Sequence, residues 1–359
     1  MKLLTGLRRE GIPAALGAAL LFGAGTPLAK LLLHAVNPWL LAGLLYLGSG
    51  LGLSLYRYLS HAPAVKLPSN EAPWFAGAIL AGGIIGPVLL MLGLNGMSAS
   101  GASLLLNAEG VFTALLAWFV FKENFDRRIA LGMIAIVVGA VILSWSGEAR
   151  LEGVWPALAV LGACLAWGID NNLTRKVSLT DATWIAAAKG LVAGTVNLLL
   201  AFIAGASLPP LTLVGAAMLV GFFAYGVSLT LFVLGLRHLG TARTSAYFSV
   251  APFIGALLAL AMGEPITLTL GVAGTCMALG IWLHLTEQHG HAHDHEALEH
   301  DHEHVHNDLH HQHAHAAGGD ATDATDATDV TLSHSHPHRH SHLTHVHSHF
   351  PDAHHQHRH

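Results

Sequence analysis

The stretch from Ser103 to Phe121, SLLLNAEGVFTALLAWFVF, is long and apolar enough to cross a bilayer, yet it carries Asn107 and Glu109 near its middle. A charged side chain at the centre of a membrane helix costs at least about 2.5–3.5 kcal/mol. Glu109 is therefore expected to face protein or water, to be paired, or to be protonated. Three roles fit such a carboxylate: proton coupling, counter-charge for a cationic substrate, or structural pairing with a basic residue.

Similar apolar runs recur along most of the chain. Of its 359 residues, 53 % are hydrophobic and 11 % are charged, whereas a soluble domain usually has about 25 % charged residues. Lipid offers the backbone no hydrogen-bond partner, so each run is predicted to form a helix of an all-α integral membrane protein. Ten transmembrane helices are expected, at residues 12–33, 38–59, 72–94, 101–121, 128–146, 154–174, 182–205, 211–236, 241–262 and 266–284.

Basic residues are distributed unevenly between the breaks. If the N-terminus is cytoplasmic, the cytoplasmic breaks and the N-terminal segment contain twelve Lys and Arg residues, whereas the opposite breaks contain only Arg150. Short loops rich in Lys and Arg stay on the cytoplasmic side. We therefore expect a multi-pass protein of a bacterial inner membrane. An even number of spans places both termini in the cytoplasm.

The two halves of the apolar region, residues 12–146 and 154–284, resemble each other. Three short stretches recur in the same order, at a near-constant spacing of about 141–145 residues. With five helices each, the halves are predicted to insert in opposite orientations, as in many secondary transporters. The matched stretches are Phe22-Gly-Ala-Gly-Thr-Pro-Leu-Ala-Lys30 with Trp167-Gly-Ile-Asp-Asn-Asn-Leu-Thr-Arg175, Leu92-Gly-Leu94 with Leu234-Gly-Leu236, and Phe121-Lys-Glu123 with Met262-Gly-Glu264.

This layout, with Lys-Glu or Gly-Glu closing the fourth helix of each repeat, resembles the EamA family of the drug/metabolite transporter superfamily over residues 12–284. The resemblance implies alternating-access transport of small metabolites, often outward. Family members usually have a proline within the fourth helix of each repeat. Pro252 fits this pattern in the ninth span, whereas Glu109-Gly110 occupies the corresponding position in the fourth.

Further polar residues fall inside the predicted spans or at their ends. Lys30 lies about two-thirds along the first span, where it either pairs with Glu109 or extends toward the outer surface. Asp170 lies near the end of the sixth span, and Lys189 lies at a similar depth in the seventh. They form either a pair that gates the cytoplasmic side or an interfacial helix end beside a snorkelling lysine. Trp167, Tyr225 and Tyr247 either line a pocket or pack in the core. The candidate residues for substrate binding or coupling are Glu109, Asn107, Lys30, Asp170, Asn171, Lys189, Trp167 and Tyr247.

Residues 286–359 form a separate segment, with 24 of the 28 histidines and 12 Asp and Glu against 2 Arg. Such a composition cannot bury a core and predicts a disordered cytoplasmic tail. Alternating His-x-His places imidazoles on one side of an extended chain, where they could bind zinc, nickel, copper or cobalt. A passive low-complexity tail and a pH-responsive polyampholyte are the alternatives. The candidate metal ligands are His289, His291, His293, His295, His300, His302, His304, His306, His334, His336, His338, His340 and His342.

The leading interpretation is a secondary active transporter that exports small metabolites or drugs by alternating access. The first alternative is a transporter of divalent nickel, cobalt or zinc, or a carrier gated by metal at its tail. The second is a membrane-anchored metal buffer without transport. No nucleophile–base pair, phosphate loop or paired-cysteine motif is evident, so we expect neither an enzyme nor a required cofactor. The expected partners are membrane lipids and a small-molecule substrate, with divalent metal ions and a second copy of the chain as further candidates, and no nucleic acid.

Overall fold

The computed structural model describes residues 11–121, 127–144, 151–177, 180–285, 290–295, 299–304, 334–339 and 343–348. Seven helices in these ranges are long and apolar enough to cross a membrane. Three shorter apolar helices accompany them, at Ala130–Leu143, Ala251–Ala261 and Leu268–Leu283. The chain is thus a multi-pass helical protein, as the sequence predicts, whereas the count of ten transmembrane helices stays a prediction.

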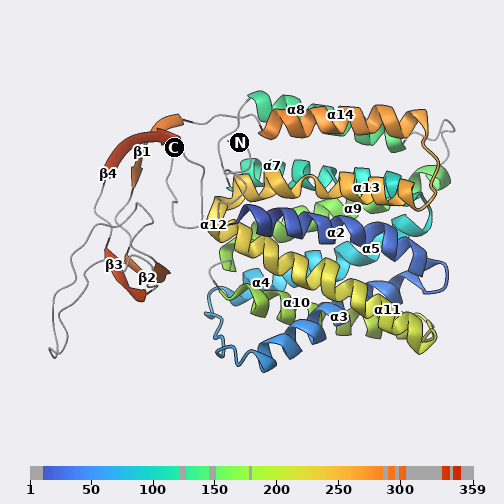
Figure 1. Ribbon diagram of the computed structural model, residues 1–359, viewed down its shortest axis with the longest axis horizontal. Coiled ribbons are helices and arrows are strands. Elements are labelled where there is room, and N and C mark those ends of the chain that lie inside the picture. Colours follow the sequence, from blue (N-terminus) through green and yellow to red (C-terminus); the bar gives the residue numbers. More distant parts are fainter. Residues whose placement is uncertain are drawn as a thin grey trace. The chain divides into compact units, whose positions relative to one another are not determined.

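The helices run side by side through the apolar part of the chain (Figure 1). The first half contains α2 (Ile12–Leu33), α3 (Pro38–Leu59), α4 (Ala72–Ala78), the π-helical segment η1 (Ile79–Ile85), α5 (Gly86–Asn95), α6 (Ala99–Leu105), α7 (Ala108–Phe121) and α8 (Arg127–Ser144). The second half contains α9 (Leu151–Thr174), the short 3-10 helix η2 (Arg175–Val177), α10 (Ala182–Ile203), α11 (Leu211–Gly221), the π-helical segment η3 (Phe222–Val227), α12 (Ser228–Phe248), α13 (Ala251–Ala261) and α14 (Leu268–Leu285).

The second helices of the two halves, α3 and α10, cross at close range. A Cβ atom added to Gly190 would lie 2.5 Å from the backbone nitrogen of Gly50, closer than any real Cβ contact. Only a residue without a side chain allows the two backbones to approach this far. Gly190 and Gly194, one turn apart on α10, both lie at this contact with α3.

Asp181 caps the start of α10 and ties it to the end of α3. Its Oδ1 accepts the backbone N–H of Trp184 at 2.8 Å, and Arg57 Nη1 donates to the same oxygen at 2.6 Å. Burial would raise the pKa of the Asp181 carboxyl, but hydrogen bonds from Thr183 and Trp184 and the charge of Arg57 hold it below its ordinary value. This end of the α3–α10 pair is thus fixed by charge as well as by packing.

The third helix of each half contains one of the two π-helical segments. η1 packs against α9 and α10, and η3 packs against α2 and α3. Each segment therefore touches the first two helices of the other half, which is the exchange of neighbours that a duplicated fold produces. A π turn inserts an extra residue and leaves carbonyl groups without a regular helical partner.

A membrane-length apolar helical segment, Ala99–Leu116, lies at the predicted fourth span, but the helix is interrupted within it. α6 ends at Leu105 and α7 begins at Ala108. The Asn107 side chain donates to the carbonyl of Leu104 at 2.9 Å. In a continuous α-helix that carbonyl would accept the N–H of Ala108. The side-chain amide thus competes with the helix for its own backbone, as Asn often does.

The predicted span 241–262 is broken as well. α12 ends at Phe248 and α13 begins at Ala251, with Pro252 in its first turn. Proline has no N–H to donate, and its ring clashes with the carbonyl four residues earlier, here that of Phe248. The two halves therefore interrupt corresponding helices with different residues.

α12 reverses direction along its length. A Cβ on Gly235 would lie 2.9 Å from the side chain of Thr244, and the ring centroids of Phe232 and Phe248 are 4.8 Å apart. A straight α-helix would separate residues 235 and 244 by about 13.5 Å. The chain thus turns back between them, in the region where the sequence predicts the break between the eighth and ninth spans.

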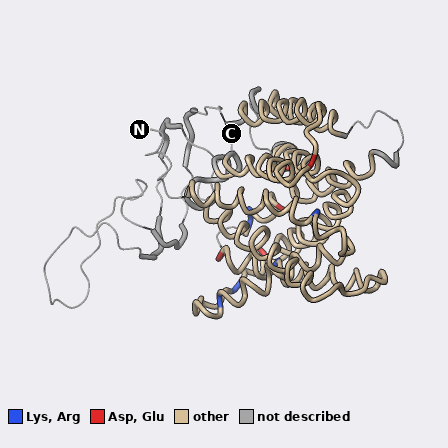
Figure 2. The backbone as a smooth tube through the Cα atoms, turned by 45° about the vertical axis from the view of Figure 1, so that its right-hand side comes forward, with Lys and Arg blue, Asp and Glu red and all other residues tan. Residues whose placement is uncertain are grey.

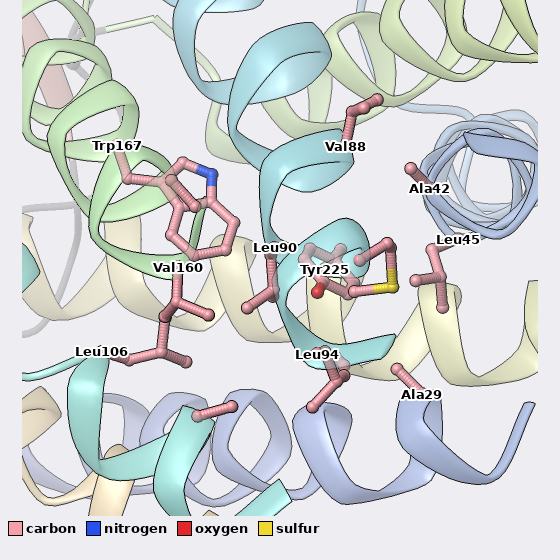
Figure 3. Packing of buried hydrophobic residues seen from close by; sticks show 14 of the residues in the cluster. Ala29, Ala42, Leu45, Val88, Leu90, Leu94, Leu106, Val160, Trp167 and Tyr225 are labelled. Carbon is pink, nitrogen blue, oxygen red and sulfur yellow. The ribbon is translucent and has the colours of Figure 1, made fainter. Parts of the chain in front are cut away.

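The interior of the helical part is packed with apolar side chains. Figure 3 shows Leu90 and Leu94 beside Val160, with Trp167 and Tyr225 in the same region. Leu90 and Leu94 belong to α5, whereas Val160 and Trp167 belong to α9. Charged residues are sparse along the described helices, as Figure 2 shows. The few that are buried therefore need a specific explanation.

Four strands lie within the tail: β1 (Gly290–His295), β2 (Glu299–His304), β3 (His334–Arg339) and β4 (Leu343–Ser348). β1 pairs with β4 and β2 pairs with β3, both antiparallel. The expectation of a disordered tail stays a prediction. The His-x-His alternation has the two-residue period of a strand, and the register places His291 opposite His347 and His302 opposite His336.

Candidate functional site

A cavity of about 80 Å³ lies inside the helical part of the chain. It is well below the roughly 300–1,000 Å³ of pockets for drug-sized ligands. Helices α2, α3, α7, α9, α10 and α12 and the segment η3 supply its walls, so both halves contribute. The lining residues are Phe22, Tyr46, Ser49, Glu109, Trp167, Asp170, Asn171, Ala186, Lys189, Ala224, Tyr225, Ser228, Leu229, Phe232 and Phe248.

Asp170 of α9 and Lys189 of α10 form an ion pair at the cavity wall. Lys189 Nζ donates to both carboxylate oxygens, at 2.6 and 2.7 Å. The two residues are 7 % and 3 % exposed, and the Thr174 hydroxyl donates to Asp170 at 2.8 Å. The predicted Asp170–Lys189 pair is confirmed as a contact. Both charges are compensated at close range, as burial requires.

Glu109 lines the same cavity but has a neutral partner. Asn171 Nδ2 donates to Glu109 Oε1 at 2.7 Å, and it lies 3.4 Å from the hydroxyl of Thr113. Glu109 also occupies the first turn of α7, where the exposed N–H groups and the helix dipole stabilise a negative charge. The break between α6 and α7 therefore helps to explain how an acid is tolerated within this apolar stretch.

The alternative pairing of Glu109 with Lys30 is wrong. Lys30 Nζ donates to the carbonyls of Leu94 at 2.7 Å and Asn95 at 3.3 Å, at the C-terminal end of α5. A cation is favourable there because the last carbonyls of a helix carry partial negative charge. Lys30 is not one of the described residues that line the cavity.

Glu264, from the stretch that closes the ninth span, contacts the start of α6 near Lys30. Its carboxylate accepts the N–H groups of Ala99 at 2.7 Å and Ser100 at 2.8 Å. Burial would raise the pKa of Glu264, but the hydrogen bonds from Ser100 and Ala99 and the charge of Lys30 outweigh it and hold the pKa below its ordinary value. The connection between α5 and α6 is thus held at both ends by a charge that complements the helix terminus.

Aromatic rings form much of the cavity wall. Phe22 of α2 contacts Trp167 and Tyr225 edge to face, with ring centroids 5.8 and 5.9 Å apart, and lies 5.3 Å from Phe248. Trp167 Nε1 donates to the carbonyl of Gly82 in η1 at 2.9 Å. Trp167 and Tyr225 are among the side chains labelled in Figure 3. The rings are therefore held by their neighbours and by a backbone group that the π turn leaves open.

Two candidate residues lie elsewhere. Asn107 is buried at the helix break, where it donates to Leu104 and contacts the sulfur of Met277. Tyr247 is half-buried and does not appear among the described lining residues, whereas its neighbour Phe248 does. Of the three aromatic residues for which pocket lining and core packing were the alternatives, Trp167 and Tyr225 line the cavity and Tyr247 is not among its described lining residues.

Phe22, Tyr46 and Phe248 line the cavity without having been predicted to do so. Phe22 carried a usable signal, because the internal repeat aligns it with Trp167, and both residues reach the cavity. The repeat therefore relates these two lining positions, although it does not relate all of them, because Gly25 and Thr26, aligned with Asp170 and Asn171, are not among the described lining residues. The sequence held no comparable signal for Tyr46.

The candidate metal ligands of the histidine-rich tail have no described side-chain positions. For the strands only the backbone is described, and His289, His306, His340 and His342 lie outside the described residues. Among the residues with described side chains, no group of three His, Cys, Asp or Glu is arranged to hold a metal. Metal binding by the tail stays a prediction.

A helical membrane fold built from two similar halves around a cavity with buried charges defines a membrane transport protein. The sequence profile of the EamA-like transporter family matches residues 9–145 and 154–286. The chain belongs to this family, and the family resemblance seen in the sequence is confirmed.

Known proteins agree with this assignment. An uncharacterised transporter of Methanothermobacter thermautotrophicus is 27 % identical over 295 residues, covering 77 % of this chain and 86 % of the relative. A probable amino-acid metabolite efflux pump of Salmonella typhimurium is 29 % identical over 175 residues, or 47 % of this chain and 54 % of the pump. One crystal structure, 19 % identical, superposes with a TM-score of 0.60 over 76 % of this chain and 98 % of its own. The structural likeness concerns the fold alone.

Proposed function

We propose that this chain exports a small metabolite across a bacterial inner membrane by alternating access, with the cavity as its substrate site. The observation that carries the proposal is the placement of Glu109, Asp170 and Lys189 around one buried space lined by both halves. Ionisable groups are rarely buried in a membrane protein unless they serve a substrate or ion pathway. The outward direction draws on the efflux activity named for the Salmonella relative.

The proposal assigns proton coupling to Glu109. Among the described residues, the one hydrogen-bond partner of its carboxylate is the neutral Asn171, so no neighbouring cation fixes its charge. A proton can therefore bind and leave with little rearrangement of its surroundings. Glu109→Gln retains the size and removes the charge. We expect its flux to lose the response to an imposed pH gradient; an unchanged rate and pH response would leave only a packing role.

Transport itself is tested by reconstitution of the full chain into liposomes and measurement of the efflux of a panel of amino acids, amines and organic acids. Trp167→Ala removes an aromatic side chain from the cavity wall and should reduce flux strongly. Trp74→Ala is the matched control, because Trp74 is 43 % exposed on α4 and lies outside the cavity lining. If no compound leaves faster than from protein-free liposomes, or if both variants retain full flux, the proposed function is wrong.

A further inference from the structure

The charges around the cavity do not cancel. Among the described residues that line the cavity, three have a carboxyl or amino group in the side chain: Glu109, Asp170 and Lys189. Lys189 already donates to both oxygens of Asp170, so these two neutralise each other. Glu109 forms no ion pair with any described residue. An ionised Glu109 therefore leaves the cavity with one negative charge.

One oxygen of Glu109 remains available. Asn171 donates to Oε1, and the described hydrogen bonds of this carboxylate do not involve Oε2. A carboxylate oxygen at a cavity wall can accept a charge-assisted hydrogen bond from an ammonium group, which is shorter and stronger than a neutral one. The site thus offers an acceptor whose natural complement is a cationic donor.

The aromatic wall favours the same ligand. Phe22, Trp167 and Tyr225 meet beside the cavity, with Phe22 in contact with the other two rings. Aromatic faces attract cations and also pack against apolar or aromatic groups. A ligand with an ammonium end and an apolar body would use both parts of the wall.

A substrate carboxylate has no equivalent partner. Lys189 is the cation among the described lining residues, and Asp170 occupies it. An α-amino acid would bring a carboxylate into a space that already contains two acids, so its binding would require the Asp170–Lys189 pair to open. An amine without a carboxylate avoids this cost.

From these observations we propose that the cavity selects a small organic monoamine. Its ammonium group pairs with Glu109, and its apolar body lies against Phe22, Trp167 and Tyr225. This inference rests on the proposed function and narrows its substrate class. It also separates this chain from an amino-acid carrier, because the decisive feature is a single uncompensated carboxylate.

The test uses four compounds that share a phenyl ring and differ in charge: 2-phenylethylamine, 2-phenylethanol, phenylacetate and L-phenylalanine. Binding to the full-length protein in nanodiscs is measured by calorimetry at neutral pH. We expect the amine to bind about tenfold or more tightly than each of the others, a difference that one charge-assisted contact supplies. Equal or tighter binding of phenylalanine, or equal binding of the alcohol, overturns the proposal.

Variants assign the charge. Glu109→Gln should reduce amine affinity by about tenfold and leave the weak binding of 2-phenylethanol unchanged, whereas Glu109→Asp should retain a preference for the amine. Glu71→Gln is the matched control, since Glu71 precedes α4 and does not line the cavity. An amine affinity that Glu109→Gln leaves intact also overturns the proposal. If Glu109→Gln does not fold, the comparison of the four compounds on the unaltered protein still decides.

Failure of this inference is distinguishable from failure of the proposed function. If the liposomes export amino acids or organic acids but no amine, the proposed transport function stands and the monoamine as substrate class is wrong. If the liposomes export none of these compounds, both the proposed function and the monoamine inference are wrong.

Discussion

The two halves of this protein share their backbone devices but not their polar residues. Both third helices contain a π-helical segment, and both fourth helices break near the middle. Where α9 has Asp170-Asn171-Asn172, however, the aligned stretch of α2 reads Gly25-Thr26-Pro27. A duplicated scaffold therefore carries an unsymmetrical set of charges. The symmetry supplies the shape of the helical part, and the departures from it supply the polar residues of the cavity.

The largest expected effect concerns the Asp170–Lys189 ion pair. Its acid belongs to the aligned stretch of the second half, and the matching stretch of the first half has no charged residue at that position. Lys189→Met leaves Asp170 buried without its partner, and breaking a buried pair costs about 3–5 kcal/mol. Thermal unfolding in detergent should show the loss. The double variant Asp170→Asn with Lys189→Met should recover most of it, since neither charge then remains unpaired.

Lys66→Met is the control for this comparison, because Lys66 is exposed in the loop after α3. It should unfold at the same temperature as the unaltered protein. If Lys189→Met does so too, the ion pair contributes nothing to the fold, and the contrast between the two halves loses its energetic content.

A smaller effect is expected at the helix breaks. Asn107→Ala removes the side-chain hydrogen bond to Leu104, and a typical buried hydrogen bond contributes about 0.5–1.5 kcal/mol. Chemical denaturation measures the change, with Asn70→Ala in an exposed turn as the control. An Asn107→Ala protein that is as stable as the control would show that the break does not depend on this side chain.

The smallest effect is expected at Glu264, where α13 leads into α14. Glu264→Gln removes a negative charge from the start of α6, and such a charge is worth about 0.3–1 kcal/mol. Because the pKa of Glu264 is lowered in the folded protein, its contribution is complete above the unfolded pKa of about 4.3 and declines as the pH falls through the folded value.

The difference in melting temperature between the unaltered protein and Glu264→Gln should therefore be largest near neutral pH and shrink below about pH 4. Glu71→Gln serves as the reference for a general loss of negative charge. A difference that stays constant with pH would show that Glu264 acts through packing and not through its charge.

Much of this arrangement is predictable from the sequence, and the remainder has identifiable physical reasons. Hydropathy locates the helical segments, and matched depth from the cytoplasmic side predicts the contact between Asp170 and Lys189. Depth alone, however, does not determine which faces of two helices meet. Glu109 and Lys30 lie at compatible depths, yet Lys30 binds the end of α5 and Glu109 binds Asn171.

The π-helical segments are a second feature that the sequence does not predict. Each inserts an extra residue, so the side chains that follow it rotate to a different face than a regular helix would give them. Hydropathy does not distinguish Ile79–Ile85 or Phe222–Val227 from the apolar α-helices around them. The break at Pro252 is predictable from the proline, whereas the break at Asn107 depends on a side-chain contact that only the fold reveals.

The carbonyl of Gly82 accepts two hydrogen bonds, from Tyr46 at 2.7 Å and from Trp167 at 2.9 Å. These donors come from opposite halves of the chain and meet on one atom of η1. In evolutionary terms, the length of the third helix is therefore more constrained than the identity of its apolar residues. Substitutions that preserve an apolar helix there leave the carbonyl in place. Deletion of one residue from the helix before Gly82 is expected to rotate this carbonyl away from one of its two donors, and the walls of the cavity would then lose their common anchor.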